Sequence, residues 1–368
     1  MSLTILIIAC NYEGRPPILK EKLDFKAKQP LNIILLIGDG MGLSQISSSF
    51  YFNDKLPNFA RFKTIGLSNV IAANSKITDS AAGATSFACG IKTFNGAIGV
   101  NMSKKPVENI VELLSKENYQ TGLIATSSIT HATPASFYAH VVSRDCEEEI
   151  AAQMATSSID FFASGGLKFF QNRKDGKNML DLLEDNGFAI HTDVIDQKID
   201  RGKRHAFLLG QEEMPKMIEG RGNFLEKSTQ KALSYFEDNS TPFFLMVEGS
   251  QIDWAGHDND ANYLITELLD FDEMVGSVLD YAEKEANTLV IVTADHETGG
   301  FTLSGKVTGQ NFEGEDEHDY NVIFPTFSTN GHSAALIPVL AFGPHESLFS
   351  GFYQNTDIYH KIREALAL

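Results

Sequence analysis

Short apolar runs alternate with helical patterns along this 368-residue chain, and this alternation constrains the fold more than any other feature. The apolar runs cover residues 31–37, 121–126, 243–247, 289–293 and 337–342. Helical periodicity covers residues 107–116, 147–162, 224–236, 262–284 and 356–366. Continuous apolar runs indicate strands that are buried on both faces, and their alternation with helices indicates βαβ units. The sequence therefore predicts an α/β fold, a three-layer αβα sandwich around a central, mostly parallel sheet.

The folded part is expected to begin at Leu31 and to form a single catalytic domain over residues 31–368. Residues 11–30 contain prolines and lysines without hydrophobic periodicity, which predicts a linker. The stretch from about 165 to 222 is more polar and irregular than its surroundings. We interpret it as an insertion that lies over the sheet and not as a second domain.

The N-terminal residues carry an apolar run, Leu3–Ala9, that ends at Cys10 and is far too short to span a bilayer. The run resembles the end of a bacterial lipoprotein signal, with Cys10 as the lipidated residue, although no Lys or Arg precedes it. Residues 1–10 are therefore predicted to be the remnant of a lipoprotein signal, and an unstructured apolar tail is the alternative. The export interpretation predicts a periplasmic protein or one that is lipid-anchored to the envelope.

The charge balance excludes several functions. The chain has 30 Lys and Arg against 48 Asp and Glu, which gives a net charge of −18. An acidic surface repels nucleic-acid phosphates, so we expect no nucleic-acid-binding role. It also repels a phosphate substrate, unless bound cations reverse the local potential. The three cysteines form no CxxC pair, which argues against a thiolate zinc site.

Acidic residues and histidines lie at the ends of the predicted strands. Those that follow an apolar run are Asp39, Glu248, Asp253, His257, Asp295 and His296, and His332 lies just before the run at 337–342. The carboxyl ends of parallel strands meet at one edge of the sheet, where such folds bind their ligands. Four carboxylates and three imidazoles gathered there require cations, and mixed oxygen and nitrogen ligands suit zinc, with an oxygen-rich subset for magnesium. Taken singly, such residues belong more often to a turn, a surface ion pair or a protein core than to a metal site.

The candidate nucleophile is Ser80, within the segment TDSAAGAT. The small residues that follow it predict a close-packed helix, and the amide groups at a helix N-terminus favour anions. A capping role for Asp79 or Ser80 is the alternative. No GxSxG motif surrounds Ser80, so a metal is a better activator than a Ser-His-Asp triad. Arg144 offers a planar fork for two phosphate oxygens, or else forms a surface ion pair.

Six segments together resemble the alkaline phosphatases, in the order that this family shows. They are IGDGMG, TDSAAGATSFACGIKTFNGAIGV, THATPASFYAHVVSR, EGSQIDWAGH, NTLVIVTADHETGG and NGHSA. The resemblance extends from about Leu31 to the C-terminus and is weakest over residues 165–222. It implies the alkaline-phosphatase fold and a family dimer.

The resemblance also implies two zinc sites and one magnesium site. The ligands of the first zinc would be Asp253, His257 and His332. The ligands of the second zinc would be Asp39, Asp295, His296 and the Ser80 oxygen. The third metal, magnesium or alternatively zinc, would be held by Asp39, Thr133, Glu248 and waters. Arg144 would bind two phosphate oxygens, with Asp79 orienting it.

The function implied is the hydrolysis of small phosphate monoesters through a phosphoserine on Ser80, at alkaline pH, by two-zinc catalysis. The nearest alternative is a phosphodiesterase or related hydrolase of the same superfamily. A remote alternative is a non-catalytic metal-binding lipoprotein.

Two positions near the site, His131 and Trp254, resemble the marine, cold-adapted bacterial members of the family. An imidazole beside the third metal leaves the identity of that metal open. The absence of an ammonium at position 254 predicts weaker product binding, although Trp254 is also compatible with simple packing at the pocket rim.

Overall fold

The computed structural model describes residues 30–237 and 241–368, so the predicted signal, Cys10 and nearly all of the predicted linker lie outside the described residues. The strands are β1 (Asn32–Gly38), β2 (Thr64–Asn69), β3 (Gln120–Ser128), β4 (Phe161–Gly165), β5 (Phe188–His191), β6 (Arg204–Leu208), β7 (Phe243–Gly249), β8 (Thr288–Thr293), β9 (Glu297–Thr298), β10 (Thr302–Gln310), β11 (Asp316–Thr326), β12 (His332–Ser333), β13 (Ile337–Phe342) and β14 (Gly351–Gln354). The α-helices are α1 (Leu43–Phe52), α2 (Ser80–Cys89), α3 (Ile110–Lys116), α4 (Ala132–Ala135), α5 (Glu147–Thr156), α6 (Lys168–Gln171), α7 (Met179–Asp185), α8 (Phe224–Glu237), α9 (Gln251–Asp258), α10 (Ala261–Glu285) and α11 (Thr356–Leu366). Three short 3-10 helices are η1 (Asn58–Arg61), η2 (Met217–Glu219) and η3 (Glu346–Phe349).

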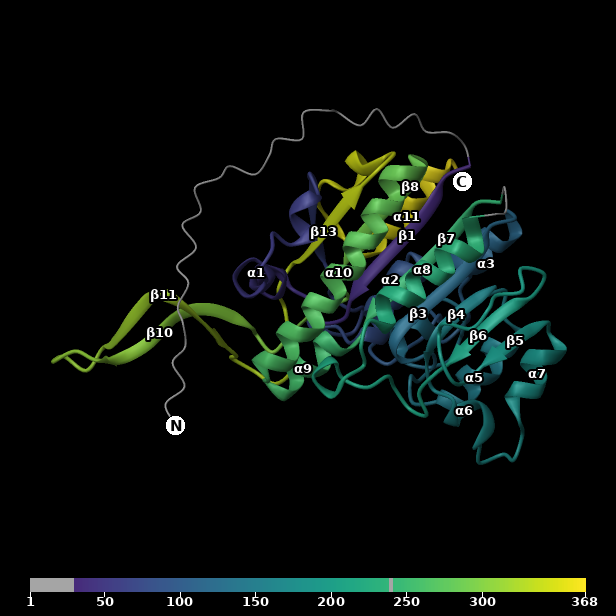
Figure 1. Cartoon of the computed structure of the whole chain (residues 1–368), viewed down its shortest axis with the longest axis horizontal. Helices are drawn as coiled ribbons and strands as arrows, with labels where there is room; N and C mark the ends of the chain where they lie inside the picture. The colour runs from purple at the N-terminus through teal and green to yellow at the C-terminus, as the bar shows by residue number, and fades with distance from the viewer. Residues whose placement is uncertain (1–29, 238–240) are drawn as a thin grey trace.

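A ten-stranded sheet forms the centre of the molecule, in the order β14-β2-β13-β8-β1-β7-β3-β4-β6-β5 (Figure 1). Its neighbours pair in parallel except at β13, which runs antiparallel to both β8 and β2. The predicted α/β class with a mostly parallel sheet is confirmed. Each of the five predicted apolar runs forms a strand of this sheet, within one or two residues at either end.

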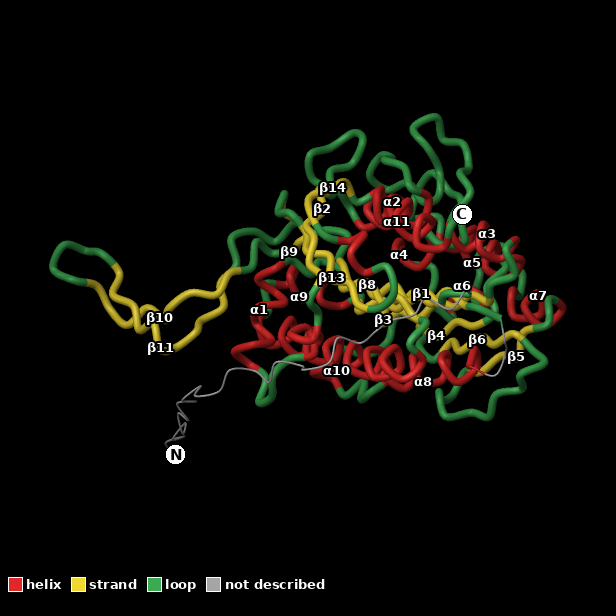
Figure 2. The backbone as a smooth tube through the Cα atoms, turned by 90° about the horizontal axis from the view of Figure 1, so that it is seen from above, coloured by secondary structure: helices red, strands yellow, loops and turns green. Residues whose placement is uncertain are grey.

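Helices cover both faces of the sheet, which gives the three layers predicted (Figure 2). The sequence of the central strand β1 is apolar throughout because both of its faces are covered. Ile33, Leu35 and Ile37 belong to the core under α2, α3, α5 and α11. Ile34 and Leu36 belong to the opposite core, under α8, α9 and α10. Alternate side chains of a strand point to opposite faces, so a strand between two helical layers has no polar face.

Two expectations differ from the structure. The helix predicted over 147–162 ends at Thr156, and its apolar C-terminal part belongs to strand β4. The stretch 165–222 does not simply lie over the sheet, because its strands β6 and β5 extend the edge in parallel beyond β4. Strands β4, β5 and β6 have only 5, 4 and 5 residues, and apolar runs of this length are too short for periodicity to separate helix from strand.

Strands β10 and β11 form a two-stranded arm that projects away from the body of the molecule (Figures 1 and 2). The arm lies between Thr298 and His332 in the chain and was not expected from the sequence. Among the described residues, no helix has the length and apolar character needed to cross a membrane.

Candidate active site

Three neighbouring strands of the sheet deliver carboxylates to one edge. Strands β8, β1 and β7 lie side by side, with Asp295 just after β8, Asp39 just after β1 and Glu248 near the end of β7. All three side chains are fully buried. The predicted convergence at the carboxyl ends of parallel strands therefore exists in the structure.

Asp253, His257 and His332 form one group that is close enough to share a cation. His257 Nε2 lies 3.1 Å from His332 Nε2 and 3.4 Å from Asp253 Oδ2. The outer ring nitrogens contact backbone carbonyls, since His257 Nδ1 lies 2.6 Å from the oxygen of Asn330 and His332 Nδ1 lies 2.8 Å from that of Thr78. A histidine that donates from one nitrogen to a carbonyl presents the other to a metal. The inner Nε2 atoms are therefore oriented as ligands.

Asp39, Asp295 and His296 form a second group. His296 Nε2 lies 3.5 Å from Asp39 Oδ1 and 3.3 Å from Asp295 Oδ2. Asp295 Oδ1 accepts hydrogen bonds from the amides of Gly40 and His296, which fixes the carboxylate. Adjacent residues can both face this site because β8 ends at Thr293.

Asp39 also belongs to a third group, with Glu248 and His131. The second carboxylate oxygen of Glu248 accepts hydrogen bonds from Ser127 and Ser250, which leaves its first oxygen without a partner. The buried Thr133 hydroxyl also lacks a partner. Asp39 therefore stands between the second and third groups, as the resemblance implies.

The residues present fit bound cations, because the site holds buried polar atoms that nothing in the described protein satisfies. Asp39 Oδ2, Asp295 Oδ2 and Glu248 Oε1 are buried without hydrogen-bond partners. Burial, with the charges of nearby carboxylates, raises the pKa of Asp39 well above its ordinary value. Burial also raises the pKa of Glu248 to about 7. Such groups are costly in an empty site, and divalent cations are the natural counter-charges.

Ser80 is the first residue of α2, directly after the N-cap Asp79. Its Oγ lies 3.2 Å from His296 Nε2 and 3.5 Å from Asp39 Oδ1. Its side chain is buried against the second group, and it faces the helix N-terminus where amide groups favour anions. The structure thus brings the predicted nucleophile to the predicted ligands.

Asp79 has both of the roles that the sequence left open. Its Oδ1 accepts a hydrogen bond from the amide of Ala82 and caps α2, while its Oδ2 accepts from Arg144 Nη1 at 3.2 Å. The second terminal nitrogen of Arg144 lies 3.1 Å from His131 Nε2. Arginine only donates, so this nitrogen of His131 accepts and the ring proton lies on Nδ1. Burial and the Arg144 charge lower the pKa of His131 to about 3, so the ring is neutral. In this arrangement His131 Nε2 faces Arg144, although the ring is also a member of the third group.

Trp254 stands at the rim beside His131, with ring centroids 5.7 Å apart and planes nearly perpendicular. It also packs against the core beneath α9. Both interpretations of Trp254, a packing aromatic and a neighbour of the site, therefore describe its position.

Thr298 is a site residue that the sequence analysis missed. Its hydroxyl donates to Asp253 Oδ1 and lies 3.1 Å from His296 Nδ1, so it joins the first and second groups. The signal was its place two residues after His296, because alternate residues of a strand face the same side. Strand β9 also pairs Thr298 with His332, which holds that candidate ligand in place.

Comparison with known proteins agrees with this geometry. A profile of the Alkaline phosphatase family matches residues 30–326. Alkaline phosphatase 4 of Bacillus subtilis (strain 168) is 32% identical over 400 residues, which cover 89% of this chain and 86% of the relative. The structure of alkaline phosphatase from the Antarctic bacterium TAB5 is 51% identical with a TM-score of 0.87, and the match covers 91% of this chain and 97% of that one. A variant of the TAB5 enzyme with Mg bound in its M3 site is 52% identical, with a TM-score of 0.88 and the same coverage. Since sequence and fold agree over most of its length, the chain belongs to the alkaline phosphatase family.

Proposed function

We propose that this chain hydrolyses phosphate monoesters through a phosphoserine on Ser80, with highest activity at alkaline pH. The observation that carries the proposal is the position of Ser80, whose Oγ lies at a helix N-terminus and within 3.5 Å of two candidate metal ligands. A serine hydroxyl is a weak nucleophile until it loses its proton, so activity should rise toward alkaline pH.

The proposed chemistry has two steps. In the first, Ser80 Oγ forms a bond to phosphorus while the bond from phosphorus to the ester oxygen breaks and the alcohol leaves. In the second, water attacks the phosphoserine, which frees Ser80 and releases inorganic phosphate. Arg144 would bind two phosphate oxygens through both steps, held by Asp79 at 3.2 Å. The N-terminus of α2 would add its amide groups.

The proposal includes three cation sites. Asp253, His257 and His332 suit zinc, as do Asp39, Asp295 and His296 together with the Ser80 oxygen. Asp39, Glu248 and Thr133 offer only oxygens, which suits magnesium, whereas His131 in the same group would favour zinc. Bound divalent cations would lower the pKa of the Ser80 hydroxyl and of a nearby water, and would stabilise negative charge on the departing oxygen.

The test compares the protein before and after chelation on p-nitrophenyl phosphate and on bis(p-nitrophenyl) phosphate. We expect turnover of the monoester, loss of turnover with the metal, and a far slower diester reaction. Ser80→Ala should abolish turnover, and acid-quenched wild-type protein should carry a phosphoryl group on the Ser80 peptide. Preferential diester hydrolysis would instead identify a phosphodiesterase. Metal binding without any turnover would support the non-catalytic lipoprotein.

Export, lipidation at Cys10 and a homodimer are further parts of the proposal. Labelled palmitate should enter the wild-type protein in a bacterial host but not the Cys10→Ala variant. Sedimentation of the purified chain would test the dimer, and a monomer at micromolar concentration would contradict it.

A further inference from the structure

The segment that carries Arg144 is irregular, because residues 136–146 lie between α4 and α5 without a long helix or strand. One short antiparallel bridge holds it, in which Ile98 and Val141 exchange two backbone hydrogen bonds of 3.0 and 2.9 Å. The amide of Arg144 then donates to the oxygen of Gly96 at 2.8 Å. The amide of Gly96 in turn donates to Asp79 Oδ2, the same oxygen that accepts from the Arg144 guanidinium. The position of Arg144 thus depends on this bridge.

His140, in the segment 136–146, stabilises the bridge by contacting the chain segment opposite. Its Nδ1 lies 2.7 Å from the oxygen of Gly99, and its backbone amide donates to the Gln153 side chain at 2.8 Å. The ring can come so close because Gly99 has a φ of +59° and a Cβ there would lie 2.7 Å from His140 Nδ1. Gly99 is tied to the nucleophile helix, since its amide donates to the hydroxyl of Thr85 on α2. A glycine is therefore required at this contact.

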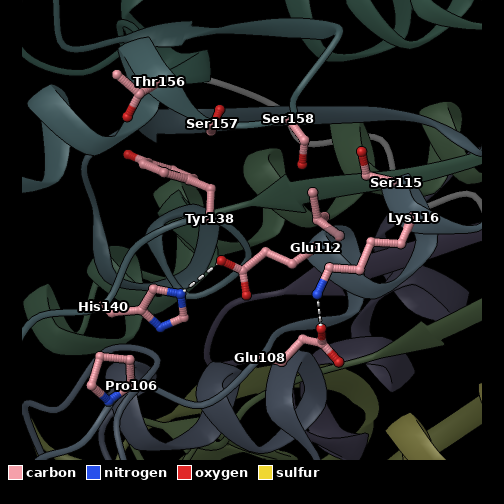
Figure 3. A pocket seen from close by; sticks show the side chains of 11 residues that line it. Pro106, Glu108, Glu112, Ser115, Lys116, Tyr138, His140, Thr156, Ser157 and Ser158 are labelled. Atoms are coloured by element: carbon pink, nitrogen blue, oxygen red, sulfur yellow. Dashed lines mark hydrogen bonds and ion pairs between the residues drawn. The ribbon is translucent and has the colours of Figure 1, made fainter.

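Glu112, on helix α3, contacts the other ring nitrogen of His140. Its Oε1 lies 3.0 Å from His140 Nε2, while its Oε2 accepts from the amide of Asn109 in a capping box at the start of α3. The carboxylate is therefore fixed in place before it meets the imidazole. The pair lies on the wall of a cavity of about 550 Å³ whose other charged residues, Glu108 and Lys116, pair with each other (Figure 3).

Both ring nitrogens of His140 face oxygens that can only accept. Only the doubly protonated imidazolium donates to the carbonyl of Gly99 and to the carboxylate at the same time. The hydrogen bond with Glu112 accordingly raises the pKa of His140, against the effect of burial. The His140 side chain is 15% exposed and the Glu112 side chain 37%, so the ion pair is partly shielded from water.

We infer that the Glu112–His140 pair is a positioning unit for Arg144, which sets where the guanidinium meets the phosphate group. The inference rests on the proposed function, since it assigns Arg144 to phosphate binding. The side-chain partners of His140 are Gly99 and Glu112, neither of which is a candidate metal ligand, so the pair acts through the bridge between residues 96–99 and 140–144.

The test is a cycle of four proteins: wild type, His140→Phe, Arg144→Ala and the double variant, all metal-loaded. His140→Phe should lower kcat/KM and weaken inorganic phosphate inhibition, each by about tenfold, because a misplacement of about 1 Å in a positioned group can cost about 100-fold and the bridge still limits the shift. In the Arg144→Ala background the same substitution should change either quantity by less than about twofold. His140→Asn, which keeps a donor to the oxygen of Gly99, should recover most of the loss. Lys116→Gln, in the same cavity, should behave as wild type.

Hydrogen exchange supplies a readout that needs no turnover. The amides of Val141 and Arg144 should exchange faster in His140→Phe than in wild type or Lys116→Gln, because their acceptors lie across the bridge. The inference would be overturned if His140→Phe lowered kcat/KM equally in the wild-type and Arg144→Ala proteins, or if it left the exchange rates of these amides unchanged. If His140→Phe does not fold, Glu112→Gln takes its place in the cycle. If the wild type has no monoesterase activity, the proposed function fails, and the cycle is completed on the dissociation constant for inorganic phosphate.

Discussion

Replacing Glu248 by glutamine should stabilise the metal-free protein at neutral pH and weaken the metal-loaded one. In the metal-free protein, burial raises the pKa of Glu248 from 4.5 to about 7. The folded state therefore holds a proton that the unfolded state has lost between these pH values, so the free energy of unfolding falls as pH rises through this window. The difference of about 2.5 pH units corresponds to roughly 3 kcal/mol. Glutamine carries no charge, so the free energy of unfolding of the variant does not fall in this way as pH rises.

The assay is thermal unfolding of wild type and Glu248→Gln from pH 4.5 to 8, with and without chelator. Without metal, the Tm of the variant relative to that of wild type should rise by about 4 °C between pH 4.5 and pH 8, given the unfolding entropy of a chain of this size. With metal, the order should reverse, because the carboxylate is then a ligand. Glu313→Gln, exposed on the arm, should follow wild type in both states. If the Tm of the metal-free variant followed that of wild type with a constant difference at every pH, the account of a buried, unpaired carboxylate would be refuted.

Three further results are expected. Trp254→Lys should tighten inhibition by inorganic phosphate and lower both KM and kcat, because an ammonium would then lie beside the product. The control Trp254→Phe should change none of these quantities. Unchanged phosphate inhibition in Trp254→Lys would contradict this expectation. Thr298→Val should weaken zinc binding by about 10- to 100-fold, measured by competition with a chromophoric chelator, because its hydroxyl orients Asp253 and His296. Equal zinc affinity in Thr298→Val and in the exposed control Thr302→Val would remove that role. Metal-free wild type should not bind inorganic phosphate in calorimetry, although Arg144 is intact, and binding without metal would show that the guanidinium suffices.

The central strands could be predicted from the sequence because burial on both faces leaves them no polar residues. Strand β1 has apolar residues at every position from Ile33 to Ile37 for this reason. The edge strands have no such signature. Strand β2 mixes glycine, serine and apolar residues, and β14 is four residues long and mostly exposed. Strand β13 was located correctly, but its antiparallel direction depends on chain connections that no local pattern records.

The candidate site was predictable to the extent that it depends on strand ends. Asp39 and Asp295 follow apolar runs directly, and a parallel sheet brings such positions to one edge. His332 is different, since it reaches the site only because β12 pairs with β9 after the long β10–β11 arm. Its position beside the run at Ile337 placed it at this edge in the sequence analysis, and its assignment to the first zinc came from the family resemblance. Thr298 and the Glu112–His140 pair were missed because they hold other residues in place, and such contacts depend on distances that spacing along the chain does not reveal.

The charges of the site explain how an acidic protein could hold a phosphate group. Asp39, Glu248, Asp253 and Asp295 carry four negative charges when ionised. The charges of Arg144 and its partner Asp79 cancel, which leaves −4 at the site. Three divalent cations would add six positive charges and change this to +2, whatever the net charge of −18 on the chain. Because the ligands are buried, that reversal is poorly screened and stays local. The same carboxylates that oppose phosphate binding in the bare protein would thus create it once cations are bound, so the acidic residues are a condition for the proposed function and not an obstacle to it.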